Sequence, residues 1–183
     1  MQNNPLSAQQ ALEKLRAGNQ IYLNATKNAG DISPATRLDA ALNGQHPYAV
    51  VVCCSDSRVI PESIFSAGIG ELFTIRVAGN VVDGFPLGSI EYAVGHLHAK
   101  LVLVLGHTCC GAVASARGVH GGYLQHIADE IKGAIGSEED PVKAAILNVE
   151  HTVKKLRLHL KNAEDVLVAG ALYHTDSGAV EFL

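Results

Sequence analysis

The sequence predicts an α/β fold: a mainly parallel β-sheet flanked by helices. Continuous apolar runs rich in valine, such as YAVVVCC (48–54) and KLVLVLGH (100–107), are typical of strands buried on both faces of a parallel sheet. Between these runs lie segments whose apolar residues recur every three or four positions, which is the period of a helix. Alternation of such strands and helices indicates parallel pairing with helices on the faces of the sheet.

The first helix is predicted in SAQQALEKLRAGNQIYL (7–23), where Ser7 and Gln10 have the spacing of a capping box. Its apolar side chains fall roughly on one helical face: Ala8, Leu12, Leu15 and Tyr22. The segment 28–45 is predicted to begin as a loop and to end in a short helix over 38–42.

Two further strands are predicted at ELFTIRV (71–77) and, as the last strand, at DVLVAGALYH (165–174). A helix is predicted over 86–97, with a proline near its start. The clearest helix is predicted over 142–160. Its apolar residues recur every three or four positions: Val142, Ile146, Val149, Val153, Leu156 and Leu160.

The composition fits a single soluble domain. The 183 residues suffice for one domain with a real core, and 48% of them are hydrophobic. That richness has two interpretations, a well-filled core or an apolar surface buried against another subunit. The net charge is −4 and the basic residues are scattered, which excludes a nucleic-acid footprint and a polybasic membrane patch.

The expected location is the cytoplasm. The opening residues, MQNNPLSAQQ, contain no basic region followed by an apolar run, so no signal peptide is predicted. The longest apolar run is far too short to span a bilayer. A reducing cytoplasm disfavours disulfides. The cysteines are therefore expected to be free, reactive or bound to a metal.

The four cysteines occur as two adjacent pairs, 53–54 in CCSDSR and 109–110 in GHTCCG. Both pairs lie at the carboxyl ends of predicted strands, where ligands bind in sheets of this kind. Successive side chains of a strand point to opposite faces. Only one cysteine of each pair is therefore expected to face a given site, and Cys54, Asp56 and Arg58 share one parity.

His107 and Cys110 are three positions apart, which suits a loop entering a helix, and CGAVASA (110–116) looks helical. Cys110 would then lie near a helix N-terminus, where the positive end of the dipole favours a thiolate. With Cys54, these residues form a Cys₂His set. Three protein ligands with a free fourth position are the arrangement of a catalytic zinc site.

A structural zinc site would need a fourth ligand, which Asp56, Cys53 or Cys109 could supply. The favoured interpretation of Cys53 and Cys109 is instead that they are packing residues facing the core, because free cysteine is commonly a small buried hydrophobe.

Six segments together are more specific than any single motif. They are LRAGNQIYL, CSDSRV, GELFTIRVAGN, LGSIEYAV, LVLVLGHTCCGAV and LVAGALYHTDSGAVEF. In this order they resemble the β-class carbonic anhydrases over nearly the whole chain. The succession of Cys-x-Asp-x-Arg and His-x-x-Cys-Gly is highly specific to that family.

The resemblance implies that Cys54, His107 and Cys110 bind one Zn²⁺ per chain, and that Asp56 and Arg58 form a dyad beside the metal. It also implies the reversible hydration of CO₂ to bicarbonate and a proton. CO₂ and bicarbonate are then the small-molecule substrates.

The resemblance further implies a dimer in which an N-terminal helix embraces the partner and the active site lies close to the subunit boundary. We therefore expect a homodimer or a dimer of dimers. The single domain, 1–183, would consist of an N-terminal helical arm, 1–45, and an α/β core, 46–183.

The charges suggest a mechanism. Two thiolates neutralise Zn²⁺, so the metal should acidify bound water less than one held by three histidines. Arg58 adds positive charge and can hold Asp56 as a carboxylate. Asp56 would orient zinc-bound hydroxide toward CO₂. Alternatively it could bind zinc as a fourth ligand and close the site, although the pair with Arg58 is favoured at neutral pH.

Some positions depart from the family pattern. Ala67 stands where many members have glutamine, and the chain has no tryptophan, so a tryptophan-dependent bicarbonate site is not expected. Val81, Phe85 and Tyr92 are candidates for lining the CO₂ pocket, although core packing is favoured for each. Surface histidines that could shuttle protons, besides the metal ligand, include His96, His98, His120 and His126.

Other functions remain open at this point. An enzyme on the same scaffold could act on carbon disulfide or carbonyl sulfide. A zinc-containing regulatory or binding module with a closed site is a second alternative. A dithiol redox protein is disfavoured, because no Cys-x-x-Cys is present.

Overall fold

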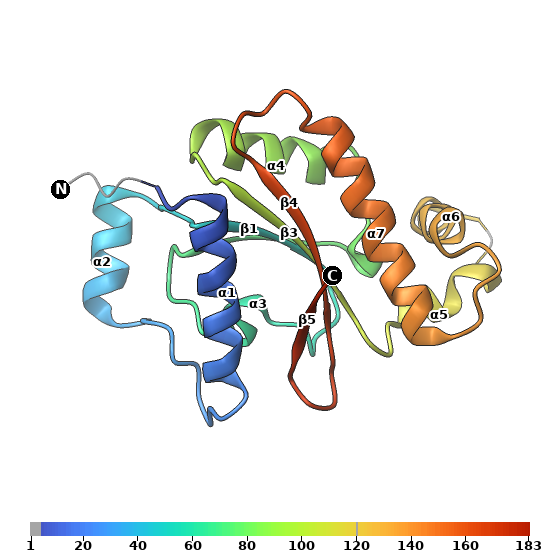
Figure 1. The fold of residues 1–183 in the computed structure, drawn as a ribbon, viewed down its shortest axis with the longest axis horizontal. Helices are drawn as coiled ribbons and strands as arrows, with labels where there is room; N and C mark the ends of the chain where they lie inside the picture. Colours follow the sequence, from blue (N-terminus) through green and yellow to red (C-terminus); the bar gives the residue numbers. More distant parts are fainter. Residues whose placement is uncertain (1–4, 120) are drawn as a thin grey trace.

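The computed structural model describes residues 5–119 and 121–183. Strands and helices alternate through the chain, as predicted (Figure 1). The strands are β1 (Ala49–Cys53), β2 (Leu72–Arg76), β3 (Leu101–His107), β4 (Leu167–Tyr173) and β5 (Val180–Phe182). The α-helices are α1 (Ala8–Tyr22), α2 (Pro34–Asn43), α3 (Pro61–Ile64), α4 (Gly84–His96), α5 (Gly111–Ser115), α6 (Leu124–Ile135) and α7 (Pro141–His159). Two 3₁₀ turns are η1 (Ala78–Asn80) and η2 (Ala116–Gly118).

The described strands form one sheet in the order β2-β1-β3-β4-β5. All neighbouring pairs are parallel except β4 and β5. In the register, Cys53 lies opposite Arg76 and His107 lies opposite Tyr173. The carboxyl ends of these strands therefore meet at one edge of the sheet, and the predicted α/β class is confirmed.

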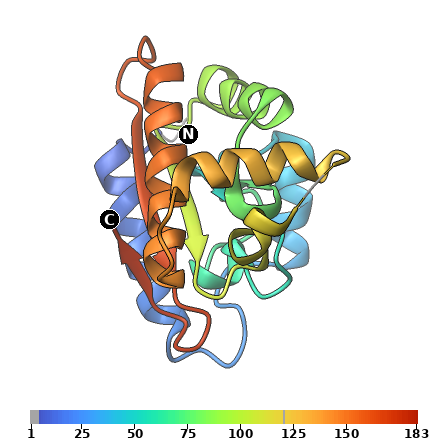
Figure 2. The same cartoon turned by 90° about the vertical axis from the view of Figure 1, so that its right-hand side faces the viewer.

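Helices cover both faces of the sheet (Figures 1 and 2). On one face, Ala11 and Leu15 of α1 and Phe65 after α3 pack against alternate residues of β1 and β3. On the other face, α4 and α7 contribute Ile90 and Val149 among others. A third buried cluster includes residues of α5, α6 and α7, and it contains Cys54 and Cys110.

The first helix begins as predicted. The Ser7 side chain accepts a hydrogen bond from the Gln10 backbone, and the Gln10 side chain accepts one from the Ser7 backbone. The helix predicted over 38–42 begins four residues earlier, at Pro34. Proline is well tolerated at the first helical position, where its missing N–H is not needed, and Ser33 caps the helix.

One strand and two α-helices of the described chain were not predicted. The strand β5 follows β4, so the prediction that 165–174 was the last strand was wrong; its three residues are too few to produce a pattern. The helix α3 is only four residues long. The helix α6 was missed although its sequence has a helical period. Ile127, Ile131 and Ile135 recur every fourth residue, and Ile131 is fully buried.

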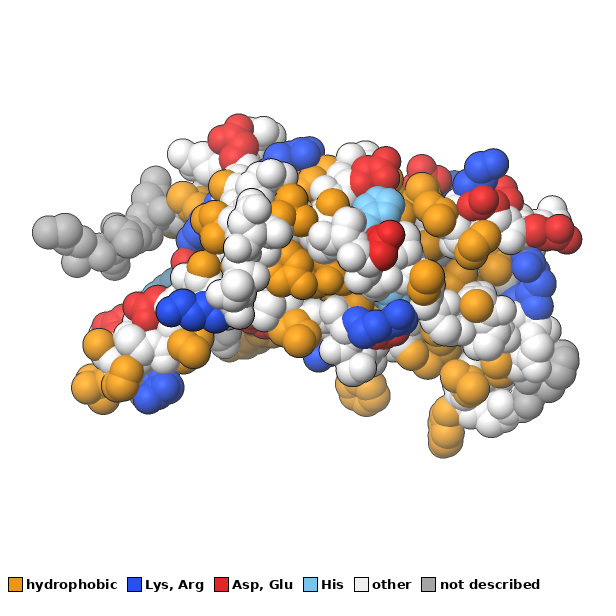
Figure 3. Space-filling model, turned by 90° about the horizontal axis from the view of Figure 1, so that it is seen from below, with side chains coloured by type: hydrophobic (Ala, Val, Ile, Leu, Met, Phe, Trp, Pro, Cys, Tyr) orange, Lys and Arg blue, Asp and Glu red, His pale blue; other side chains and the backbone are white. Residues whose placement is uncertain are grey.

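The helix α2 contains no buried residue within the described chain. It projects from the body at the left of Figure 1. Ile32, Leu38 and Leu42 are all exposed there. Figure 3, viewed from below, shows hydrophobic side chains on this projection and across the rest of that face. Of the helices described here, none is long and apolar enough to cross a membrane.

Candidate metal centre

Three metal-ligating side chains converge at the carboxyl edge of the sheet. Cys54 directly follows β1, His107 is the last residue of β3, and Cys110 is the N-cap residue of α5. One ligand atom from each lies within 4.8 Å of the others, and all three residues are buried. The strand ends thus bring together residues more than fifty positions apart.

The His107 ring is oriented for metal binding. Its Nδ1 lies 2.9 Å from the Thr108 carbonyl oxygen, a partner that can only accept, so Nδ1 carries the proton. The Nε2 atom is then an unprotonated acceptor. It is buried and has no hydrogen-bond partner among the described residues. A buried nitrogen lone pair beside two sulfur atoms fits a zinc ion, which binds this donor set.

The two sulfur atoms are coupled. A hydrogen bond from the Cys110 thiol lowers the pKa of Cys54, and the Gly79 N–H acts in the same direction. The same pairing, reinforced by burial, raises the pKa of Cys110. The shared hydrogen bond thus favours the thiolate at Cys54 and the thiol at Cys110. A divalent cation would displace the proton of that thiol, because zinc ligands bind as thiolates.

The remaining cysteines differ from each other. Cys53 is fully buried and burial raises the pKa of its thiol to about 12, so it is a packing residue, as predicted. The same prediction for Cys109 was wrong, because Cys109 is exposed. The strand has already ended at His107, so strand parity no longer applies. Cys109 has a left-handed φ of 55°, and the turn directs its side chain outward.

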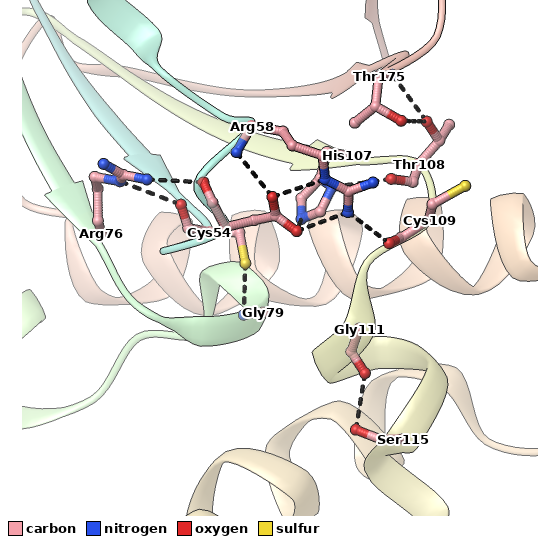
Figure 4. Close-up of polar contacts among 11 residues, drawn as sticks. Cys54, Arg58, Arg76, Gly79, His107, Thr108, Cys109, Gly111, Ser115 and Thr175 are labelled. Atoms are coloured by element: carbon pink, nitrogen blue, oxygen red, sulfur yellow. Dashed lines mark hydrogen bonds and ion pairs between the residues drawn. The ribbon is translucent and has the colours of Figure 1, made fainter.

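Asp56 and Arg58 form a bidentate ion pair beside the three candidate ligands (Figure 4). Asp56 Oδ1 accepts hydrogen bonds of 2.9 Å from both Nε and the backbone N of Arg58, and Oδ2 accepts one of 2.7 Å from Nη2. These bonds hold the pKa of Asp56 well below its ordinary value and raise that of Arg58. Asp56 Oδ2 lies 3.9 Å from His107 Nε2.

A second arginine holds the turn that carries the first motif. Arg76, the last residue of β2, donates from Nη2 to the Asp56 carbonyl at 2.8 Å and from Nε to the Cys54 carbonyl at 3.4 Å. Arg58 Nη2 also donates to the Cys109 carbonyl at 3.1 Å. Arg58 thus ties the loop after β1 to the loop after β3, and Arg76 ties the loop after β1 to the end of β2. Sequence reasoning missed Arg76, whose position at a strand end was the available signal.

The residues considered for the CO₂ pocket differ in burial. Val81 is buried in the cluster that contains Cys54 and Cys110. Core packing was the favoured interpretation of Phe85 and Tyr92 and was wrong, since their exposed fractions are 95% and 48%. Ala67 is buried beside Phe65.

The histidines His96, His98 and His126 are exposed, whereas His120 lies outside the described residues. A role for any of them in proton transfer stays a prediction.

Comparisons with known proteins agree on one family. The family model described as carbonic anhydrase matches residues 49–180. Carbonic anhydrase 2 of Mycobacterium tuberculosis is 38% identical over 138 residues, which cover 72% of this chain and 65% of that protein. The chain thus spans less than two thirds of that relative. The carbonic anhydrase of Mycolicibacterium smegmatis is 33% identical over 198 residues, covering 98% of this chain and 93% of that protein.

Solved structures lead to the same group. A crystal structure of tetrameric β-carbonic anhydrases from the ascomycete Sordaria macrospora matches with a TM-score of 0.68 and 26% identity. The match covers 96% of this chain and 94% of that one.

Proposed function

The chain belongs to the β-class carbonic anhydrase family, and from this premise we propose that it catalyses the reversible hydration of CO₂ to bicarbonate and a proton. The observation that carries the proposal is the buried cluster of Cys54, His107 and Cys110 beside a carboxylate. It combines the ligand set of a catalytic zinc site with a group that can accept a hydrogen bond from water.

Cys54, His107 and Cys110 would hold the zinc ion. Zinc, when bound, supplies a Lewis acid that makes water a nucleophile near neutral pH. The chain prepares the ligands for it: the Thr108 carbonyl fixes the His107 tautomer, and hydrogen bonds favour the Cys54 thiolate.

Asp56 and Arg58 are the proposed catalytic dyad. The Arg58 guanidinium engages both Asp56 oxygens, which keeps the carboxylate ionised and fixed in direction. A fixed carboxylate can accept a hydrogen bond from the attacking water and thereby aim its free lone pair at CO₂. These two bonds occupy both carboxylate oxygens, so they compete with the binding of Asp56 to the metal as a fourth ligand. They favour the open site, in which the metal keeps a position for water.

The substrate needs shape more than polar contacts, because CO₂ is small and apolar. Val81, packed in the buried cluster with Cys54 and Cys110, supports an apolar wall next to the ligands. CO₂ would then lie between an apolar wall at Val81 and the polar pair of Asp56 and Arg58.

The proposed assembly is a homodimer or a dimer of dimers, with 1–45 as an N-terminal arm on the 46–183 core. The helix α1 packs on its own sheet. The exposed apolar residues of α2 therefore supply the surface that a second copy would cover. The described thiols are all free, which supports the proposed cytoplasmic location.

The test is stopped-flow CO₂ hydration, followed with a pH indicator, on protein loaded with one zinc per chain. Turnover should far exceed the buffer rate and disappear in a His107→Ala variant. Carbonyl sulfide and carbon disulfide are assayed in parallel. Fully zinc-loaded protein that hydrates CO₂ no faster than buffer would refute the proposal, and turnover of a sulfur substrate alone would redirect it.

A further inference from the structure

A buried polar side chain on α7 contacts the metal centre indirectly. Asn148 is 1% exposed, although its neighbours on this helix, Ala145 and Val149, pack as ordinary apolar residues. Burying an amide is costly unless it is hydrogen-bonded. Asn148 Nδ2 donates to the Gly79 carbonyl oxygen at 2.8 Å. Thr152, one turn further along α7 and also buried, donates from Oγ1 to the next carbonyl, that of Asn80, at 3.5 Å.

Gly79 relays these contacts to a metal ligand. Its N–H donates to Cys54 Sγ at 3.3 Å (Figure 4). Glycine adopts many conformations, and this one has a left-handed φ of 68°. A Cβ there would lie 2.7 Å from Ile131 Cδ1 and 3.3 Å from the Ala112 Cβ. A side chain there would be strained by this φ and would crowd Ile131 and Ala112. Hydrogen bonds to the Gly79 and Asn80 carbonyls restrict the backbone torsions of the turn and so help to keep the Gly79 N–H in one direction.

An N–H···S bond changes the sulfur as a ligand. It stabilises the thiolate and withdraws negative charge from it. A thiolate with less charge donates less to the metal, which stays more electrophilic. That effect matters at this site because two thiolates are expected to neutralise Zn²⁺, which weakens its ability to acidify water.

We propose that Asn148 and Thr152 are positioning residues that hold the Gly79 N–H on the Cys54 sulfur and thereby keep the bound metal electrophilic. The inference rests on the proposed role of Cys54 as a metal ligand. Neither residue is hydrogen-bonded to Cys54, His107 or Cys110 in the part of the chain that the structure describes. Both act through consecutive carbonyls of the η1 turn.

The test uses Co²⁺-substituted protein, whose thiolate-to-metal charge-transfer band reports the charge on sulfur without any turnover. Asn148→Leu removes the donor at similar volume. Thr152→Val removes the hydroxyl with the shape retained, and Thr152→Ser is its matched control. Loss of the N–H···S bond should leave one metal per chain and move the band to longer wavelength. The shift should be larger in Asn148→Leu than in Thr152→Val and absent in Thr152→Ser.

In the zinc enzyme, kcat should fall about 10-fold in Asn148→Leu, as for other residues that orient metal ligands, with KM little changed. If Asn148→Leu does not fold, the Thr152 pair carries the test. A band at the wild-type position in every folded variant would overturn the inference. Absence of any thiolate band in the unmutated Co²⁺ protein would instead refute the proposed metal site itself.

Discussion

Thr108 and Thr175, 67 positions apart, hold each other through two hydrogen bonds. The Thr175 N–H donates to Thr108 Oγ1 at 3.0 Å, and the two hydroxyl oxygens are 3.0 Å apart. The Thr108 N–H continues the sheet by donating to the Tyr173 carbonyl at 2.9 Å. The turn after β3 is thereby fixed to the end of β4. The Thr108 carbonyl that orients His107 belongs to this fixed turn.

Thr108→Val should weaken zinc binding. It leaves the Thr175 N–H without its acceptor and loosens the carbonyl that sets the His107 tautomer. Residues that orient metal ligands typically contribute about 10-fold or more to affinity. Zinc affinity, measured by competition with a chromophoric chelator, should fall by that factor. Thr108→Ser keeps the hydroxyl and should restore it. Equal affinity in Thr108→Val and the wild type would contradict this role.

The four cysteines should separate into two classes on mutation. Cys54→Ser should lose most zinc and destabilise the fold, because metal binding is coupled to folding. Cys53→Ser should keep one zinc per chain. It places a hydroxyl in a fully buried position and should cost about 1–3 kcal/mol in urea unfolding. Cys109→Ser, at an exposed position, should change neither quantity. Full zinc in Cys54→Ser, measured by elemental analysis, would refute the ligand assignment.

The sequence predicts the candidate metal ligands better than it predicts the residues that hold those ligands in place. Cys54 and His107 stand at the ends of valine-rich strands, so their convergence follows from the parallel sheet. The environment of Asn148 does not follow, because its partner is a carbonyl 69 positions away and a lone polar residue in a helix looks like an exposed one. Cys109 was assigned to the core because free cysteine is commonly buried, but it lies in a left-handed turn after the strand and is exposed.

The helices show the same division. The long period of α7 predicts its whole span within one residue at either end. The period of α6 is equally readable in Ile127, Ile131 and Ile135, and was missed although the signal was there. The strand β5 is only three residues long, too short for a pattern to identify it, although Val180 and Phe182 pack against the core.

Arg58→Ala should abolish activity even at pH 8. Without the guanidinium, Asp56 Oδ2 loses its hydrogen bond and Oδ1 keeps only the bond from the backbone N–H of residue 58, so the carboxylate can turn to bind the metal and displace water. Arg58→Lys keeps the positive charge but cannot form the bidentate pair with Asp56, and it should retain part of the turnover. Zinc content should stay near one per chain in both variants. Near-normal CO₂ hydration by Arg58→Ala at pH 8 would show that the dyad argument is wrong.

Protonation of Glu71 at low pH should lower the free energy of unfolding. Its Oε2 accepts the Gly68 N–H at 2.7 Å and its Oε1 pairs with Lys14 at 2.6 Å. Burial opposes ionisation of this carboxyl, but these two contacts outweigh it and lower the pKa of Glu71. Because the pKa of Glu71 is lower in the folded state than in the unfolded state, the ionised carboxylate stabilises the fold at pH values above the unfolded pKa of about 4.3. That stabilisation is lost as the pH falls through the folded-state pKa.

Glu71→Gln should therefore lower the free energy of unfolding at pH 7, and the difference from wild type should shrink as the pH is lowered below 4. Urea unfolding at both pH values measures this. Lys14→Met removes the partner and is the matched variant. An undiminished difference at low pH would mean that the carboxylate charge is not the cause.

Leu42→Glu should disrupt assembly. Leu42 lies on α2, which buries no residue in the described chain, and its side chain is 74% exposed. If a second copy covers this helix, a charge there is buried unpaired and the dimer dissociates. Deletion of α1 would not test this interface, because Ala11 and Leu15 pack on the chain's own sheet. Leu158→Glu, on α7 and 65% exposed, is the matched control and should leave the mass unchanged. Light scattering at micromolar concentration reports the outcome, and a well-behaved monomer for the intact chain would rule out the proposed assembly.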